Sequence, residues 1–100
     1  MIEIASAQEP GFKVLAVKGE LDLDASPRLL AEIQAALKAA SGIKVNLRGV
    51  SYVDSSGIAV LIQGYKLALK QKLQFVLREP SPQVITVLEL SQLRSFFVFE

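Results

Sequence analysis

One short segment of the chain carries the residue types that could do chemistry. Asp54-Ser55-Ser56-Gly57 places two hydroxyls between a carboxylate and a glycine, directly after one apolar run and before another. A second segment, Glu20-Leu21-Asp22-Leu23-Asp24, supplies three more carboxylates. A serine in such a place can be a nucleophile, a helix cap or an acceptor of a phosphoryl group, and the rest of the sequence decides among these roles.

The composition excludes most catalytic roles. The chain of 100 residues has no His and no Cys, so neither serine has the usual proton acceptor. Lys66 would lie about 16 Å from Ser55 along one helix, which excludes a Ser–Lys pair within that helix. No glycine-rich phosphate loop or dinucleotide fingerprint is present. We therefore expect a protein that is not an enzyme and that uses no cofactor.

The acidic residues raise the question of a metal site. Four carboxylates could gather at one end of a sheet and bind a divalent cation: Glu20, Asp22, Asp24 and Asp54. Solvated loop charge is the simpler interpretation, and we expect no metal.

Charge and hydropathy limit the partners. Eleven Lys and Arg against ten Asp and Glu give a net charge of +1, which provides no basic field for nucleic acid. The longest apolar run, Ile58–Ile62, is far shorter than the roughly 20 residues that span a bilayer. The start of the chain lacks the pattern of a signal peptide. We expect no nucleic-acid partner, no direct membrane insertion and a cytoplasmic location.

Apolar periodicity and turn signals predict alternating strands and helices. A hairpin turning at Glu9-Pro10-Gly11 is followed by three helix–strand units, and Ser26-Pro27 and Ser81-Pro82 are the start signals of two helices. The last run, Phe96–Phe99, is apolar on both faces and predicts a buried or paired strand. The order β-β-α-β-α-β-α-β predicts one α/β domain over residues 1–100. Its mixed sheet has an N-terminal hairpin and then β-α-β units, with helices packed on it. The expected strands cover residues 2–4, 12–17, 43–53, 73–77 and 96–99, and the expected helices cover 26–40, 58–72 and a short segment from 81.

The segment around Ser55 is expected to join a strand to a helix. Asp54 is then placed to cap the free amides of Ser56 and Gly57. Open α/β sheets place their functional surface outside the carboxyl ends of the strands. A hydroxyl held there is exposed on a rigid element, as a phosphoacceptor must be.

These motifs resemble those of a known family. The stretch Val50–Leu61, VSYVDSSGIAVL, resembles the signature of STAS domains, most closely that of anti-sigma-factor antagonists. Gly19-Glu20-Leu21-Asp22 is similar to the other short motif of the family, and Ser81–Leu90 to its third helix.

The resemblance implies a mechanism called partner switching. It assigns Ser55 as the phosphoacceptor and Asp22, Asp54, Ser56 and Gly57 to the phosphorylation loop and the partner-binding surface. The implied partners are an anti-sigma factor with serine-kinase activity and a phosphatase. The unphosphorylated antagonist binds the anti-sigma factor and frees the sigma factor, and phosphorylation releases the antagonist.

A second role stays open at this point. STAS subunits also occur in ABC complexes that move phospholipids between bacterial membranes, where the small domain binds and stabilises the ATPase. In that role Ser55 would be a capping and contact residue without regulated phosphorylation.

Overall fold

The computed structural model describes residues 2–100 and confirms the mixed α/β fold. One five-stranded sheet has the strand order β1-β2-β3-β4-β5. β1 pairs antiparallel with β2, and each later neighbour pairs in parallel. The elements are β1 (Ile2–Glu9), β2 (Phe12–Leu21), α1 (Ser26–Lys38), β3 (Gly42–Val53), α2 (Ser55–Lys70), β4 (Phe75–Arg78), α3 (Pro82–Leu90) and β5 (Val98–Phe99).

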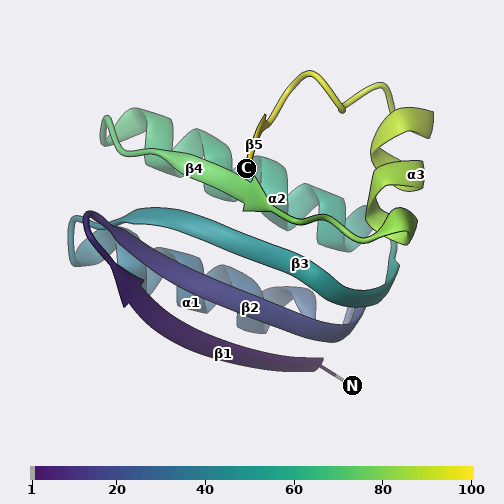
Figure 1. Cartoon of the computed structure of the whole chain (residues 1–100), viewed down its shortest axis with the longest axis horizontal. Helices are drawn as coiled ribbons and strands as arrows, with labels where there is room; N and C mark the ends of the chain where they lie inside the picture. Colours follow the sequence, from purple (N-terminus) through teal and green to yellow (C-terminus); the bar gives the residue numbers. More distant parts are fainter. Residues whose placement is uncertain (1) are drawn as a thin grey trace.

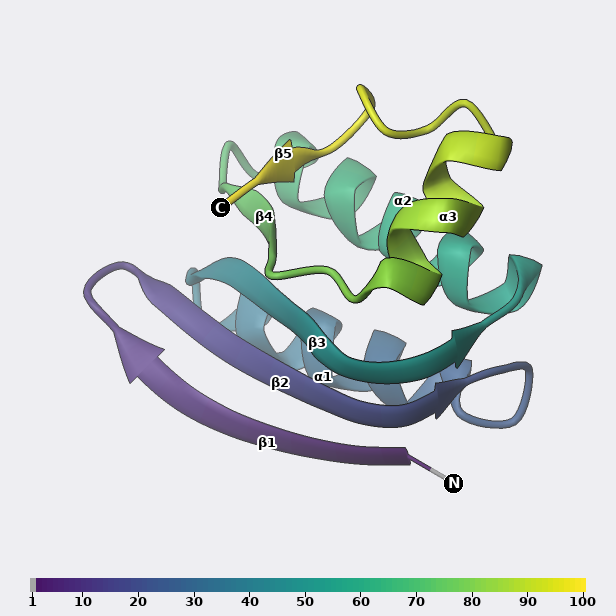
Figure 2. The ribbon, with the colours of Figure 1, turned by 45° about the vertical axis from the view of Figure 1, so that its right-hand side comes forward.

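The helices are distributed unevenly over the sheet. In Figure 1, α1 and α2 lie together behind the strands and cover one face of the sheet. Figure 2 shows α3 at the end where β3 runs out, and α3 packs against β3. The opposite face of the sheet carries no helix within the described residues.

The core lies between the sheet and the two covering helices. Alternate residues of the central strands, such as Leu15, Val45 and Leu77, are fully buried there. They meet the apolar stripe of α1, represented by Leu29 and Ile33, which are also fully buried. This packing holds the strand ends and helix starts in fixed relative positions.

The start of α1 differs from the prediction. Ser26 is not the N-cap: the capping position is Ala25, and the Ser26 hydroxyl donates to the Asp22 carbonyl at 2.6 Å. The Asp22 carboxylate accepts from the Ala25 amide at 3.0 Å instead. A side-chain turn formed by Asp22 therefore leads into the helix, and the Arg28 and Leu29 amides, from which a capping Ser26 would accept, donate to the Ala25 carbonyl. The other start signal is confirmed, because Ser81 Oγ accepts from the Val84 amide at 3.3 Å.

The last strand is shorter than expected and lies at an edge. β5 contains only two residues. They pair with β4, which confirms one of the two predicted alternatives, but Val98 is 54% exposed and the predicted extent over 96–99 was wrong. Phe96 and Phe97 leave the sheet to pack on Tyr65, with ring centroids 4.9 Å and 6.1 Å from it. Aromatic packing against α2 thus replaces strand pairing in this segment. At the other end of the chain, β1 reaches Glu9 and not only Ile4.

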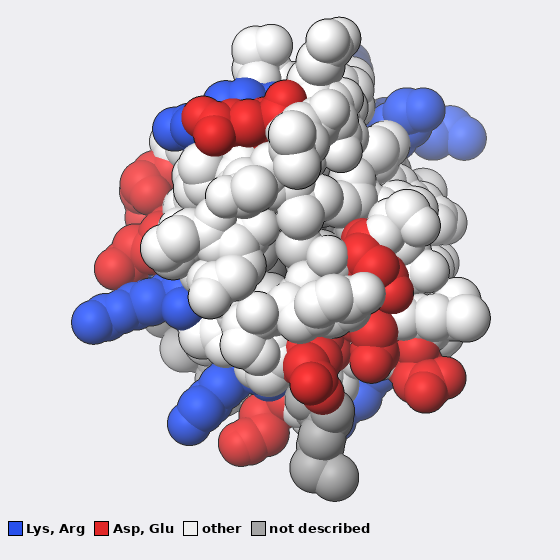
Figure 3. Space-filling view, turned by 90° about the vertical axis from the view of Figure 1, so that its right-hand side faces the viewer, with Lys and Arg blue, Asp and Glu red and all other residues white. Residues whose placement is uncertain are grey.

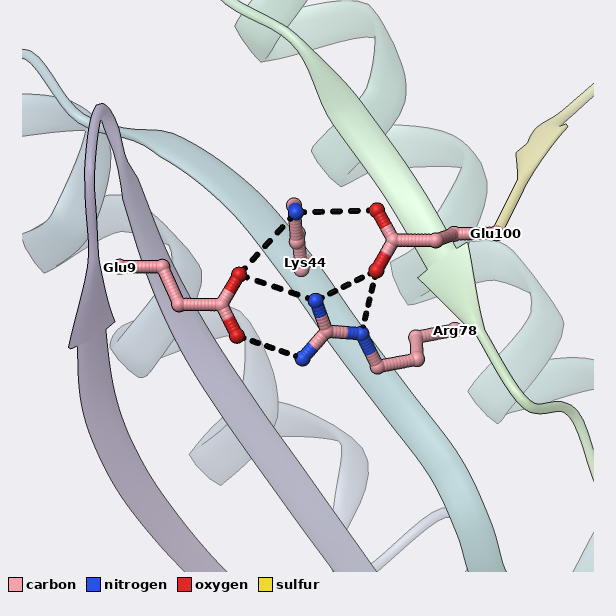
Figure 4. Close-up of polar contacts among 4 residues, drawn as sticks. All are labelled: Glu9, Lys44, Arg78 and Glu100. Atoms are coloured by element: carbon pink, nitrogen blue, oxygen red, sulfur yellow. Dashed lines mark hydrogen bonds and ion pairs between the residues drawn. The ribbon is translucent and has the colours of Figure 1, made fainter.

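Four charged side chains meet on the uncovered face of the sheet (Figure 4). This charge quartet consists of Glu9, Lys44, Arg78 and Glu100. Lys44 Nζ contacts Glu9 Oε1 at 3.1 Å and Glu100 Oε1 at 2.9 Å. The Arg78 guanidinium bridges the same two carboxylates, with Nη1 2.8 Å from Glu9 Oε2. The quartet links the two outer parts of the sheet, since its members come from β1, β3, β4 and the residue after β5.

Acid is expected to weaken this link. Hydrogen bonds from Arg78 and then Lys44 lower the pKa of Glu9 from 4.5 to about 2. Since the folded-state pKa is the lower one, the stability that Glu9 contributes is present above pH 4.5 and is lost as the pH falls towards 2. We expect Glu9→Gln to reduce the free energy of unfolding in urea at pH 7 and to cost progressively less between pH 4.5 and pH 2. Glu3→Gln, on the same strand but outside the quartet, is the control; an equal pH-dependent loss in both variants would contradict the assignment.

Candidate functional site

The two motif segments lie next to each other at the carboxyl ends of β2 and β3. The last pair of the parallel ladder is Leu21 with Val53, so Asp22 and Asp54 follow directly on neighbouring strands. Neighbouring strands are about 4.8 Å apart. α1 and α2 begin from these two segments. Figure 3 looks onto this end of the molecule, where acidic side chains gather beside an uncharged surface.

Asp54 caps α2 as predicted. Its backbone is extended, and its Oδ1 accepts from the Ser56 amide at 2.9 Å and from the Gly57 amide at 3.2 Å. The Ile58 amide donates to the Asp54 carbonyl at 3.1 Å. The carboxylate therefore already occupies two of the amides that an anion at this helix terminus would otherwise use.

Removal of the cap should destabilise the domain measurably. Asp54→Ala leaves the Ser56 and Gly57 amides without their acceptor, and the expected loss is about 0.5–2 kcal/mol of unfolding free energy. Asp54→Asn retains a side-chain oxygen that can accept both bonds, so most of the stability should return. Urea unfolding measures both variants; an Asp54→Ala variant as stable as the wild type would contradict the capping role.

Ser55 and Ser56 differ in accessibility. Ser55 is the first residue of α2 and is exposed, and within residues 2–100 its side chain makes no hydrogen bond. Ser56 is half-buried and its amide is held by Asp54. Of the two hydroxyls, the one at Ser55 is therefore the more accessible to another macromolecule.

Gly57 is the point where the two segments touch. A Cβ on Gly57 would lie 2.6 Å from the Leu21 carbonyl oxygen and 2.8 Å from Val53 Cγ2. The Asp54 amide donates to the same Leu21 carbonyl at 3.4 Å. Only a residue without a side chain permits this approach, so Gly57 fixes the start of α2 against the end of β2.

Asp22 shapes the other segment. Its Oδ1 holds the Ala25 amide, and its carbonyl accepts from both the amide and the hydroxyl of Ser26. Asp22 thus orders the loop beside Asp54, and its half-buried side chain adds negative charge to this end of the sheet.

Two exposed apolar side chains flank the segments and were missed in the sequence. Leu23 is 70% exposed and Tyr52 is 51% exposed. Tyr52 stands opposite Glu20 in the ladder, one pair before the strands end. Alternation along β3 was the signal, because Val53 faces the core and Tyr52 must then face away from it.

Within residues 2–100, no group of three or more carboxylates is arranged to hold a metal ion. In the same part of the chain, no helix combines the length and the apolar character needed to cross a membrane.

Comparison with known proteins gives consistent matches. The family model described as "Mlab, STAS domain" matches residues 4–98. The anti-sigma-B factor antagonist of Bacillus subtilis is 26% identical over 78 residues, which are 78% of this chain and 72% of that protein. The fold is similar to that of an anti-sigma factor antagonist from Mycobacterium paratuberculosis, with a TM-score of 0.88 and 23% identity over 99% of this chain and 85% of that chain. It is also similar to the Bacillus cell fate determinant SpoIIAA in its phosphorylated form, with a TM-score of 0.76 and 23% identity over 98% and 91% of the two chains.

Proposed function

The chain belongs to the STAS domain family, and on that premise we propose that it is an anti-sigma-factor antagonist switched by phosphorylation of Ser55. Unphosphorylated, it binds a cognate anti-sigma factor with serine-kinase activity and so frees the sigma factor. Phosphorylated, it is released, and a phosphatase restores the hydroxyl by hydrolysis. The protein itself acts by binding and not by catalysis.

The observation that carries the proposal is the Ser55 hydroxyl, which is exposed and makes no hydrogen bond within the described residues. It lies at the start of α2, beside the carboxyl ends of β2 and β3. In the transfer, Ser55 Oγ bonds to the γ-phosphorus of the kinase's ATP, and the bond from that phosphorus to the leaving oxygen of ADP breaks. The proton of Oγ passes to a base of the kinase. Support from relatives comes from the sequence similarity to an antagonist and from the similar fold of SpoIIAA, whose structure is known in a phosphorylated form.

The effect on the fold should be small. Phosphate adds about −1.5 to −2 charge at neutral pH. The helix dipole favours a negative charge at this position by about 0.3–1 kcal/mol. The negative charge of the Asp54 carboxylate repels the phosphate, and this carboxylate already accepts from the Ser56 and Gly57 amides. These contributions partly cancel, so the modification acts on a docked partner and not on the stability of the domain.

Intact mass measurement of the protein from its own cells tests the proposal. A mass increase of one phosphate, mapped to Ser55 and absent in Ser55→Ala, is the expected result. Ser56→Ala should keep the modification. Phosphate on Ser56, or an unmodified protein under several growth conditions, would overturn the assignment of Ser55.

A second candidate function rests on the family model, whose description names Mlab and not an antagonist. It is the role of a STAS subunit that binds and stabilises the ATPase of a phospholipid-transport ABC complex. Capture of partners from the native cell separates the two: a kinase-like anti-sigma factor supports the first function, and a transporter ATPase supports the second.

A further inference from the structure

β1 is an edge strand without the usual protection. It has neighbours on one side only, and its eight pairs with β2 continue without a bulge. Its middle residues, Ala5 to Gln8, are exposed and uncharged, and the strand contains no Lys and no Pro. Proteins commonly block free edges with such residues or with bulges, because an open row of backbone groups accepts another strand.

The geometry shows which backbone groups of β1 are free. Opposite residues in an antiparallel ladder alternate between hydrogen-bonded and non-hydrogen-bonded pairs. The two-residue turn closes on the pair Glu9–Phe12, so every second residue counted back from Glu9 directs its backbone groups towards β2. Ile4, Ser6 and Gln8 therefore direct theirs outward. Ile2 belongs to the same outward set, and its carbonyl accepts from Arg28 Nη1 at 3.0 Å.

The charges of β1 do not oppose self-pairing. Glu3 and Glu9 are the only charged residues on the strand. Glu9 is held by Lys44 and Arg78 in the charge quartet, so its negative charge is compensated. The segment between them is neutral.

We propose that β1 pairs antiparallel with β1 of a second copy of this chain, about a two-fold axis through Ser6. In this register Ser6 pairs with Ser6, and Ile4 pairs with Gln8 of the second copy. These are the three residues whose backbone groups are free, and each such pair forms two N–H···O bonds. The two sheets join into one continuous sheet, and both copies keep their helices on the same face.

The register favours a second copy as the occupant. Ala5-Ser6-Ala7 reads the same in both directions about Ser6, so the small side chains of Ala5 and Ala7 lie opposite each other. Glu3 meets Glu9, whose charge is already compensated. An interface of one strand is smaller than that of a permanent dimer, so we expect a reversible dimer with a dissociation constant on the order of 100 µM.

Sedimentation over about 10 to 500 µM protein tests the proposal. The wild-type mass should rise towards that of a dimer, and the Ser6 amide should gain protection from hydrogen exchange. Ser6→Lys places two ammonium groups opposite each other and should weaken association at least about tenfold. Ser6→Pro removes an outward N–H and should do the same, because the ladder with β2 does not use that group. Gln63→Lys, an exposed change of equal charge on α2, should associate like the wild type.

Two results would overturn the proposal. One is a wild-type chain that remains a monomer at about 500 µM. This includes the case in which the β1 amides gain protection from hydrogen exchange only when another protein is added. The other is a dimer that forms equally well in Ser6→Lys, which would place the interface elsewhere. Partner binding at Ser55 lies at the strand ends and is measured separately, so either result leaves the proposed function untouched.

Discussion

Ser55→Asp is expected to weaken binding of the proposed anti-sigma partner by about 30-fold or more. An uncompensated charge in a desolvated interface costs about 2–5 kcal/mol, and about 1.4 kcal/mol corresponds to a factor of ten in affinity. Ser55 is exposed at the start of α2, where a carboxylate fits the helix dipole, so the thermal midpoint should stay nearly unchanged. Titration calorimetry with the purified partner and a thermal scan of the free protein measure the two effects.

Two further variants make this result specific to the site. Ser55→Ala should bind like the wild type, because it introduces no charge. Gln74→Asp adds the same charge at an exposed position just before β4, away from the carboxyl ends of the strands, and should leave the affinity unchanged. Equal loss of affinity in Ser55→Asp and Gln74→Asp would indicate a general charge effect. An unfolded Ser55→Asp variant would contradict the separation of switching from folding.

The parts of the site that lie close in sequence could be predicted from it. The Asp54 cap depends on amides two and three residues ahead, and the chain pattern of a strand followed by small polar residues and an apolar helix contains that information. The same local reasoning was correct for Ser81 and wrong for Ser26. The difference is Asp22, whose carboxylate accepts from the Ala25 amide in a turn that leads into α1 and whose carbonyl accepts from the Ser26 hydroxyl, so that Ala25 and not Ser26 is the N-cap. Competing local acceptors cannot be ranked from residue types alone.

The parts that depend on distant residues could not be predicted. Glu9 and Arg78 are 69 residues apart in the sequence, and no spacing rule relates them. They meet because the hairpin and the parallel ladders bring β1 and β4 across one face of the sheet, where no helix covers them. The shortness of β5 also depends on a residue that is distant in the sequence, since Phe96 and Phe97 pack on Tyr65 of α2. An apolar pattern predicts that such residues are buried, but it does not show whether they pack in a strand of the sheet or against a helix.

The contact between the site's two segments depends on one missing side chain. Gly57 lies against a backbone atom, the Leu21 carbonyl oxygen, which also accepts from the Asp54 amide. A backbone atom cannot rotate away as the end of a long side chain can. Any residue larger than glycine must therefore push the first turn of α2 away from β2, and Ser55 moves with it.

Gly57→Ala should consequently be the most destabilising small change at the site. Its Cβ would lie 2.6 Å from the Leu21 oxygen, and the expected loss is about 3 kcal/mol, at the upper end for overpacking. For a domain of this size that loss lowers the thermal midpoint by roughly 10–20 °C. Gly49→Ala is the matched control: its Cβ meets Lys18 no closer than 3.1 Å on the exposed side of β3, so its loss should be clearly smaller. Calorimetric scans of both variants decide the matter, because equal midpoints would mean that the start of α2 is not fixed against β2.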